Sequence, residues 1–158
     1  MSGSSRRTVQ WPGGVALLAL LAVAGCAKVN DTALRLVSTP VEAHAVVAGQ
    51  LLTGEVVLVP DRTGRVSLRG DADSTLSCVG GMRYTASNAG VVDLRCNDGT
   101  ELVLQYTLLS ETRGYAYGVS AAVPASLVFG LAAPEAAAYL RPPTGKALLL
   151  RDGLLQLQ

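Results

Sequence analysis

The sequence predicts a mainly β protein, an antiparallel meander that forms a sandwich or a partly closed barrel, with one short helix near residues 134–140. Three observations support this prediction. Apolar and polar residues alternate over residues 66–108, turn motifs separate the alternating runs, and hydrophobic residues make up 49% of the 158 positions. That fraction is enough for a buried core and argues against a disordered chain. The net charge of +1 argues against a nucleic-acid-binding surface.

The alternation over residues 66–108 assigns each side chain to a face. Even-numbered positions are apolar and the odd-numbered positions between them are mostly polar. A period of two places one side of a strand in the core and the other in water, whereas a helix repeats its apolar residues every three to four positions. The residues predicted to face the core are Val66, Leu68, Leu76, Cys78, Met82, Tyr84, Ala86, Val92, Leu94, Cys96, Leu102, Leu104, Tyr106 and Leu108.

Two glycine-containing turns connect the central strands of this meander. Asn88-Ala89-Gly90 and Asn97-Asp98-Gly99 each stand between alternating runs. A three-residue loop that ends in a left-handed glycine is a common hairpin connection. With loops of this length, Leu94 is expected opposite Leu102 across the second turn and opposite Tyr84 across the first. An odd loop length preserves parity, so the apolar residues all fall on one face.

Short apolar runs predict the remaining elements. Strands are expected at residues 41–47, 56–59, 65–68, 147–150 and 154–157, of which the last two form a closing hairpin. Pro134 and Glu135 suit the first turn of a helix, and Pro142-Pro143 cannot continue it. Residues 113–118 are expected to form a loop or a bent strand.

The N-terminus has the parts of a secretory signal in their usual order. Arg6 and Arg7 form a basic start, residues 15–24 are all apolar, and Gly25-Cys26 follows directly. This apolar run is shorter than the roughly 20 residues that cross a hydrocarbon core, but it suits the hydrophobic region of a signal peptide. Val23-Ala24-Gly25-Cys26 resembles the lipobox of bacterial lipoproteins, whose cysteine is acylated. The alternative is an uncleaved N-terminal anchor.

This resemblance implies a domain organisation and a location. It divides the chain into a signal peptide over residues 1–25, a short lipidated tether over residues 26–31 and a single β-rich domain over residues 32–158. Lipidation at Cys26 would make the membrane a partner of the protein. Ala27 differs from the aspartate that retains such lipoproteins at the inner membrane, so in a Gram-negative host the periplasmic face of the outer membrane is expected.

Cys78 and Cys96 are expected to form a disulfide, because an exported protein meets an oxidising compartment. Their spacing raises a geometric problem. If residues 79–81 were a third hairpin loop, the two cysteines would lie two strands apart, about 9.6 Å, whereas a disulfide needs Cα atoms within about 7 Å. We therefore expect a sharp bend at Gly80-Gly81 that folds Cys78 over the sheet. The alternative is a reduced pair.

The sequence offers little material for catalysis or metal binding. His44 is the only histidine of the chain. A catalytic histidine needs an orienting partner, and a zinc site usually needs several His or Cys ligands. Serines and aspartates are plentiful, so a triad stays open, but no motif places one near His44. The prediction is therefore that the protein has no catalytic, metal-binding or cofactor-binding residues and is not an enzyme.

The polar face of the predicted sheet contains three charged residues near one another. The expected register places Arg83 beside Arg95 and Arg95 beside Glu101. Like charges directly opposite are unfavourable, and Glu101 offsets part of the repulsion. The favoured interpretation is a solvated face with one ion pair. A patch that binds an anionic ligand is the alternative.

The functional expectation is a non-catalytic envelope lipoprotein, a structural or interaction module anchored in a membrane. The segment from Gly90 to Gly99, followed by Gly114-Tyr-Ala-Tyr-Gly118, loosely resembles small β-rich lipoproteins of unknown function, and this resemblance implies no active site. An envelope protein is the expected partner, and nucleic acid is not. The first alternative is a module that binds an apolar or anionic small ligand in a sandwich or barrel mouth, and the second is a cell-wall hydrolase.

Overall fold

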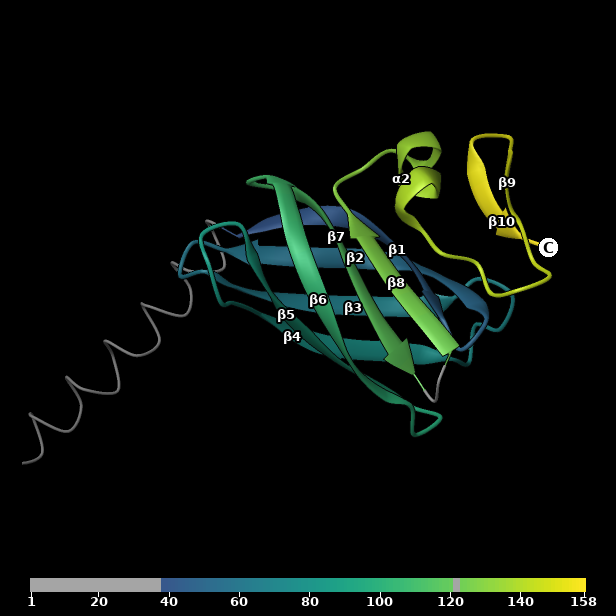
Figure 1. Ribbon diagram of the computed structural model, residues 1–158, viewed down its shortest axis with the longest axis horizontal. Coiled ribbons are helices and arrows are strands. Elements are labelled where there is room, and N and C mark those ends of the chain that lie inside the picture. The colour runs from purple at the N-terminus through teal and green to yellow at the C-terminus, as the bar shows by residue number, and fades with distance from the viewer. Residues whose placement is uncertain (1–37, 121–122) are drawn as a thin grey trace, which may run out of the picture. The chain divides into compact units, whose positions relative to one another are not determined.

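The computed structural model describes residues 38–120 and 123–158. Eight antiparallel strands follow one another around a closed barrel, and the last pairs with the first (Figure 1). The barrel strands are β1 (Thr39–Val47), β2 (Gln50–Val59), β3 (Thr63–Gly70), β4 (Ser77–Tyr84), β5 (Ala89–Cys96), β6 (Glu101–Ser110), β7 (Arg113–Ser120) and β8 (Val123–Phe129). The predicted antiparallel meander is confirmed. It closes into a complete barrel because β1 pairs with β8.

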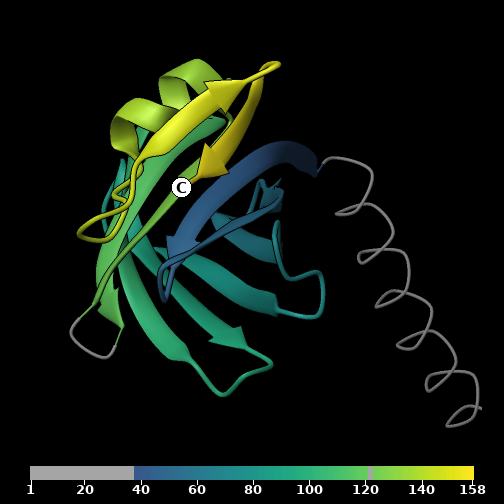
Figure 2. The same cartoon turned by 90° about the vertical axis from the view of Figure 1, so that its right-hand side faces the viewer.

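Helix α2 (Ala133–Tyr139) and a hairpin of β9 (Leu148–Arg151) and β10 (Leu154–Leu157) follow the barrel strands. Figure 2 shows them beside one another on the outside of the barrel. The expected short helix and the closing hairpin are therefore confirmed. Among the described residues, no helix is long and apolar enough to span a membrane.

The barrel interior is a packed apolar core. Alternate residues of every strand point inward, as the period of two predicted, and most of the inward side chains are fully buried. Tyr106 and Phe129 are the largest of these. Ala86 is an exception to the prediction, because it lies in an exposed turn between β4 and β5.

A second, smaller core joins the outside of the barrel to the C-terminal elements. Its buried members come from β1, β2, β8, α2, β10 and the segments next to α2, and they are Val46, Leu51, Val128, Leu131, Ala136, Leu140 and Leu155. Contacts from β7 add to it: Arg113 pairs with Glu135, and the Tyr115 ring stacks on Tyr139 with the centroids 4.9 Å apart. The outward face of β7 therefore helps to hold the helical segment against the barrel.

The predicted hairpin between β5 and β6 is confirmed. Leu94 pairs with Leu102, and the backbone N–H of Cys96 donates to the Thr100 carbonyl oxygen at 2.8 Å. Gly99 has φ +88°, the left-handed conformation that favours glycine at this turn.

The expected register between β4 and β5 is wrong by four residues. Tyr84 pairs with Gly90 instead of Leu94, because residues 85–88 form the turn and Ala89 already belongs to β5. The backbone N–H groups of Thr85 and Ala86 both donate to the Ala89 carbonyl oxygen at 3.0 Å. Since the shift is even, each side chain keeps its predicted face.

One expectation that rested on glycines is also wrong. Gly80 and Gly81 form no bend, because β4 runs through them as a regular strand. For residues 113–118, the strand alternative is the right one, because they belong to strand β7. At Gly114 and Gly118 an added Cβ would lie 2.6 Å from the Phe129 ring and 2.6 Å from a Leu104 methyl group, respectively. These β7 glycines make room for large core side chains and do not mark a turn.

Candidate functional site

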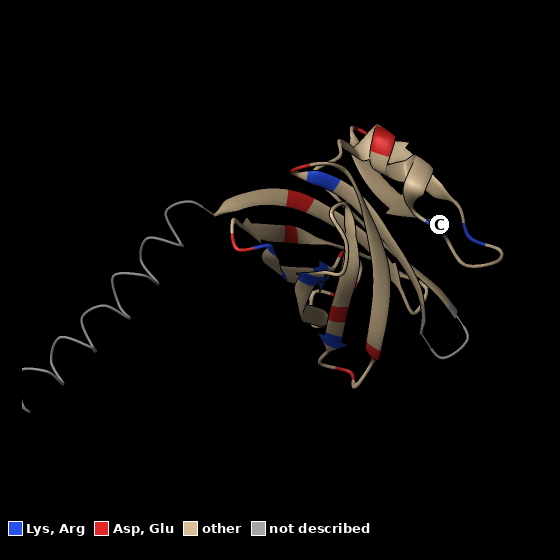
Figure 3. Ribbon diagram, turned by 60° about the vertical axis from the view of Figure 1, so that its left-hand side comes forward, with Lys and Arg blue, Asp and Glu red and all other residues tan. Residues whose placement is uncertain are grey.

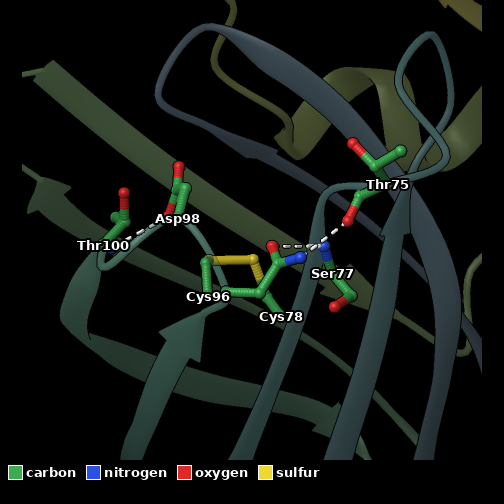
Figure 4. Close-up of a disulfide and its surroundings, with 7 residues drawn as sticks. Thr75, Ser77, Cys78, Cys96, Asp98 and Thr100 are labelled. Atoms are coloured by element: carbon green, nitrogen blue, oxygen red, sulfur yellow. Dashed lines mark hydrogen bonds between the residues drawn. A yellow bond between two sulfur atoms is a disulfide. The ribbon is translucent and has the colours of Figure 1, made fainter.

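Of the residues singled out in the sequence, Cys26 lies outside the described residues. The two other cysteines are joined in a disulfide between β4 and β5 (Figure 4). Cys78 is paired directly with Cys96, and their Cα atoms are 3.9 Å apart. The predicted disulfide is therefore present, and its geometric problem disappears because the two strands are neighbours.

Hydrogen bonds surround this disulfide at one end of the barrel. The Asn97 amide oxygen accepts from the Ser77 backbone N–H at 3.0 Å, and its amide nitrogen donates to the Thr75 carbonyl oxygen at 2.7 Å. Asp98 Oδ1 accepts from the Thr100 backbone N–H at 2.9 Å (Figure 4). Hydrogen bonds from the backbone and the side chain of Thr100 lower the pKa of Asp98. Asn97 thus connects the turn after β5 to the residues at the start of β4, so these hydrogen bonds are structural.

His44 is buried on strand β1, where it pairs with Thr53 of β2 and Val128 of β8. Its Nε2 lies 3.4 Å from Glu42 Oε1, and neither ring nitrogen makes a hydrogen bond to any residue that the structure describes. Within residues 38–120 and 123–158, no group of three or more His, Cys, Asp and Glu side chains could hold a metal ion. Around His44, the described residues therefore form no metal-binding set.

Four charged residues on the outer face of β4, β5 and β6 form two separate ion pairs. Arg95 Nε lies 3.3 Å from Glu101 Oε1, as expected, whereas Arg83 lies 3.5 Å from Asp93 and is not beside Arg95. The shifted β4–β5 register is the reason. Both pairs are largely exposed, so each contributes little to stability. Acidic and basic residues are interspersed over the strands (Figure 3), which does not favour an anion-binding patch there.

The opposite end of the barrel from the disulfide has a different composition. We call it the Arg62 end; it comprises the start of β1, the turns at residues 60–62, 85–88 and 111–112, and the end of β8. A ring of half-buried apolar side chains packs here against the barrel core, and its members are Val41, Leu58, Tyr84 and Leu108. The residues that the structure describes therefore cover the core only partly at this end.

Tyr106 lies next to this ring and has a buried hydroxyl. Its side chain is 1% exposed, and its Oη has no hydrogen-bond partner among the described residues. Gly90 lies between Tyr84 and Tyr106 in the sheet, and a Cβ at Gly90 would be 2.5 Å from the Tyr106 Cζ. Because glycine leaves this space open, the Tyr106 ring extends over β5 and meets the Tyr84 ring edge-on at 5.6 Å.

Arg62 crosses from the β2–β3 turn to the β4–β5 turn. Its Nη2 donates to the carbonyl oxygens of Ala86 and Ser87 at 3.4 and 3.5 Å, and its Cζ lies 4.9 Å from the centre of the Tyr84 ring. Arg62 has φ +67°, a conformation that costs energy for a residue with a Cβ. These contacts hold the exposed guanidinium over the aromatic side chain of Tyr84, one of the four residues of the apolar ring.

The electrostatics at this end keep the buried phenol neutral. Burial is the main reason that the pKa of Tyr106 is raised to about 12; the neighbouring Tyr84 acts in the same direction and the Arg62 charge in the opposite one. The Arg62 end therefore combines a neutral O–H donor, a guanidinium and an apolar ring. That set of groups can hold an oxyanion attached to an apolar body.

Sequence reasoning did not find this site. The alternation predicts Tyr84 and Tyr106 only as core residues, and Arg62 lies between the strands expected at residues 56–59 and 65–68, where no motif marks it. One feature of the sequence could have indicated the site: Tyr106 occupies an inward position. A buried tyrosine hydroxyl usually needs a hydrogen-bond partner, and the apolar residues at the other inward positions offer none.

Comparison of the chain with protein-family models, with curated proteins and with solved structures finds no match.

Proposed function

We propose that this chain is a non-catalytic lipoprotein of the cell envelope, whose barrel acts as a structural or interaction module anchored to a membrane through acylated Cys26. The observation behind this proposal is how the three cysteines are used. Cys78 and Cys96 are joined, which suits an oxidising compartment outside the cytoplasm. The third cysteine, Cys26, occupies the last position of the lipobox-like motif.

The packed barrel supports the role of a module more than that of a carrier with a hollow interior. The inward side chains of Leu52, Leu104, Leu127 and Phe129 are all fully buried. A partner would therefore bind at a barrel end or on the outer surface. Residues 27–38 connect Cys26 to β1 and span at most roughly 40 Å when extended, so an acylated chain would keep the barrel close to the bilayer.

The proposed location follows from the signal. In a host with two membranes, Ala27 favours the outer membrane and its periplasmic face, where an envelope protein is the expected partner. The described residues give a cell-wall hydrolase no support: the charged contact of His44 is with Glu42 on its own strand, at 3.4 Å. A small-ligand module does receive support, from Tyr106 and Arg62, and is developed below.

Cys26→Ala tests the anchor. Cells producing the wild type or this variant are fed a labelled fatty acid and fractionated. Each buried acyl CH₂ contributes about 0.8 kcal/mol, and stable anchoring takes more than one chain or signal. We expect labelled wild type in the membrane fraction, and an unlabelled variant that is unprocessed or mislocalised.

The paired substitution Cys78→Ala/Cys96→Ala is the matched control and should keep the label, because both cysteines lie in the barrel. Label that persists in Cys26→Ala, or wild type found wholly in the soluble fraction, would refute the proposal.

A further inference from the structure

We propose that the Arg62 end of the barrel is a binding site for an aliphatic monocarboxylate. Arg62 would pair with the carboxylate, the Tyr106 hydroxyl would donate a hydrogen bond to it, and the aliphatic chain would lie on the apolar ring. This inference deepens the small-ligand alternative and is independent of the lipid anchor at Cys26.

Tyr106 provides the first argument. A fully buried hydroxyl without a partner is unfavourable, and phenylalanine would fill the same space without that cost. The hydroxyl is attached to the Cζ that lies over Gly90, on the side of Tyr84. The hydroxyl has no exposed surface, so the half-buried Tyr84 side chain beside it would have to move aside to admit a ligand oxygen, which would then satisfy the donor. A neutral phenol donates without adding negative charge.

Arg62 provides the second argument. Its contacts with the carbonyl oxygens of Ala86 and Ser87 are 3.4 and 3.5 Å long, beyond the usual range for an N–H···O bond. A carboxylate is a stronger partner for a guanidinium than a neutral carbonyl group. Arg62 also has a left-handed backbone conformation, of the kind that occurs at functional sites.

Charge at this end favours a single negative charge on the ligand. Arg62 is the one basic residue of the three turns, while Asp61 and Glu111 are acidic. Asp61 Oδ1 accepts from the Thr63 backbone N–H at 3.0 Å, within its own turn. One guanidinium balances one carboxylate, whereas a dianion would meet uncompensated repulsion from the two acidic residues.

The apolar ring determines the chemistry of the part of the ligand that carries the carboxylate, an aliphatic chain. Val41, Leu58, Tyr84 and Leu108 come from four strands and are each half-buried. Deeper entry is blocked, because the interior beyond them is filled by side chains such as Phe129 and Leu104. The ligand would therefore lie across the barrel end. Its affinity should rise with chain length only until the ring is covered.

The experiment titrates the full chain carrying Cys26→Ser with sodium octanoate and follows tyrosine NMR signals and binding heat. Octanol tests the head group and acetate tests the chain. Saturable binding of octanoate is expected, with Tyr84 and Tyr106 signals shifting. Octanol should bind about tenfold more weakly, the effect of one charge-assisted interaction.

Variants locate the site. Arg62→Gln should weaken octanoate binding about tenfold and Tyr106→Phe roughly fivefold, as expected for a charged and a neutral hydrogen bond. Arg62→Lys, which keeps the charge, should lose less than Arg62→Gln. Arg69→Gln removes an exposed arginine near the other end of the barrel, and Tyr117→Phe removes an exterior phenol; both should bind like the parent.

Circular dichroism and melting curves check that each variant is folded. Absence of saturable octanoate binding by the parent overturns the proposal, and so does equal binding by folded Arg62→Gln and Tyr106→Phe. Neither result bears on the lipid anchor, which fatty-acid labelling tests separately.

Discussion

At the scale of single residues, position in the barrel decides the role of each tyrosine. Tyr115 and Tyr139 stack on the outside and help to hold α2, whereas Tyr106 lies inside, where its hydroxyl has no partner among residues 38–120 and 123–158. The sequence places Tyr84 and Tyr106 correctly on the inward face. It cannot show that Gly90 opens the space into which the Tyr106 ring extends, because that depends on a register set by the turn.

Tyr106→Phe should make the protein less sensitive to alkali. The pKa of Tyr106 is raised to about 12, mainly by burial, from an ordinary value of 10.0. The neutral phenol is favoured in the folded state, so its contribution is complete below pH 10 and is lost as the pH rises from about 10 through 12. Two pKa units correspond to at most roughly 2.7 kcal/mol.

Urea unfolding of the wild type and the variant at pH 8, 10 and 11.5 measures this difference. The variant should be at least as stable at pH 8, because it has no unpaired hydroxyl, and should lose less stability above pH 10. The same loss in both proteins would show that Tyr106 does not titrate as described.

At the scale of elements, the alternating pattern predicts faces well and registers less well. The β5–β6 hairpin is confirmed, whereas the β4–β5 register is displaced by four residues. Both turns contain Asn and Gly, but residues 85–88 form the first turn while Gly90 belongs to the strand. Several turns of the same parity satisfy one hydrophobic pattern, so the pattern alone does not choose among them.

The disulfide between β4 and β5 should be a measurable part of stability. It links residues separated by 18 positions, and a loop of this size is associated with about 3 kcal/mol in the chain-entropy treatment. In the Cys26→Ser chain, thiol titration of unfolded, unreduced protein should find no free thiol. Reduction should lower the free energy of unfolding by about that amount, measured in urea with and without reductant.

Two reactive thiols in the unreduced Cys26→Ser chain would contradict the bond. The Cys78→Ala/Cys96→Ala variant supplies the control, because reductant should not change its unfolding curve.

At the scale of the whole molecule, two cores share the strands of the barrel. Inward residues of β1 such as Ala45 belong to the main core, while outward Val46 belongs to the second core with Val128 and Leu155. The outer face of β1 and β8 therefore depends on the C-terminal hairpin for its cover. The hairpin is only two strands, and such a unit needs packing against another element to be stable.

Leu155→Ala should destabilise the protein strongly and Leu154→Ala hardly at all. Leu155 is 4% exposed in the second core, whereas the neighbouring Leu154 is 68% exposed. Removing a buried leucine side chain costs about 2–5 kcal/mol, and a change at an exposed site stays within about 0.5 kcal/mol. Thermal unfolding measures both variants, and equal melting temperatures would mean that the hairpin does not pack on the barrel as described.

The sequence by itself determined the class of the fold, the inward face of the central strands, the helix and the hairpin at the C-terminus. These features depend on local periodicity and turn chemistry, which can be read from neighbouring residues. It also indicated Cys78 and Cys96 as partners, although it placed the wrong bend between them at Gly80-Gly81.

Only the tertiary structure decided that the meander closes through β1 and β8, that Cys78 and Cys96 lie on adjacent strands, and that Arg62, Tyr84 and Tyr106 meet at one end. These are contacts between residues far apart in the chain. They depend on registers and on the space left by glycines such as Gly90, since the size of a neighbouring side chain decides how far a ring can extend. A pattern of alternating apolar and polar residues reveals neither the register between strands nor the space beside a glycine.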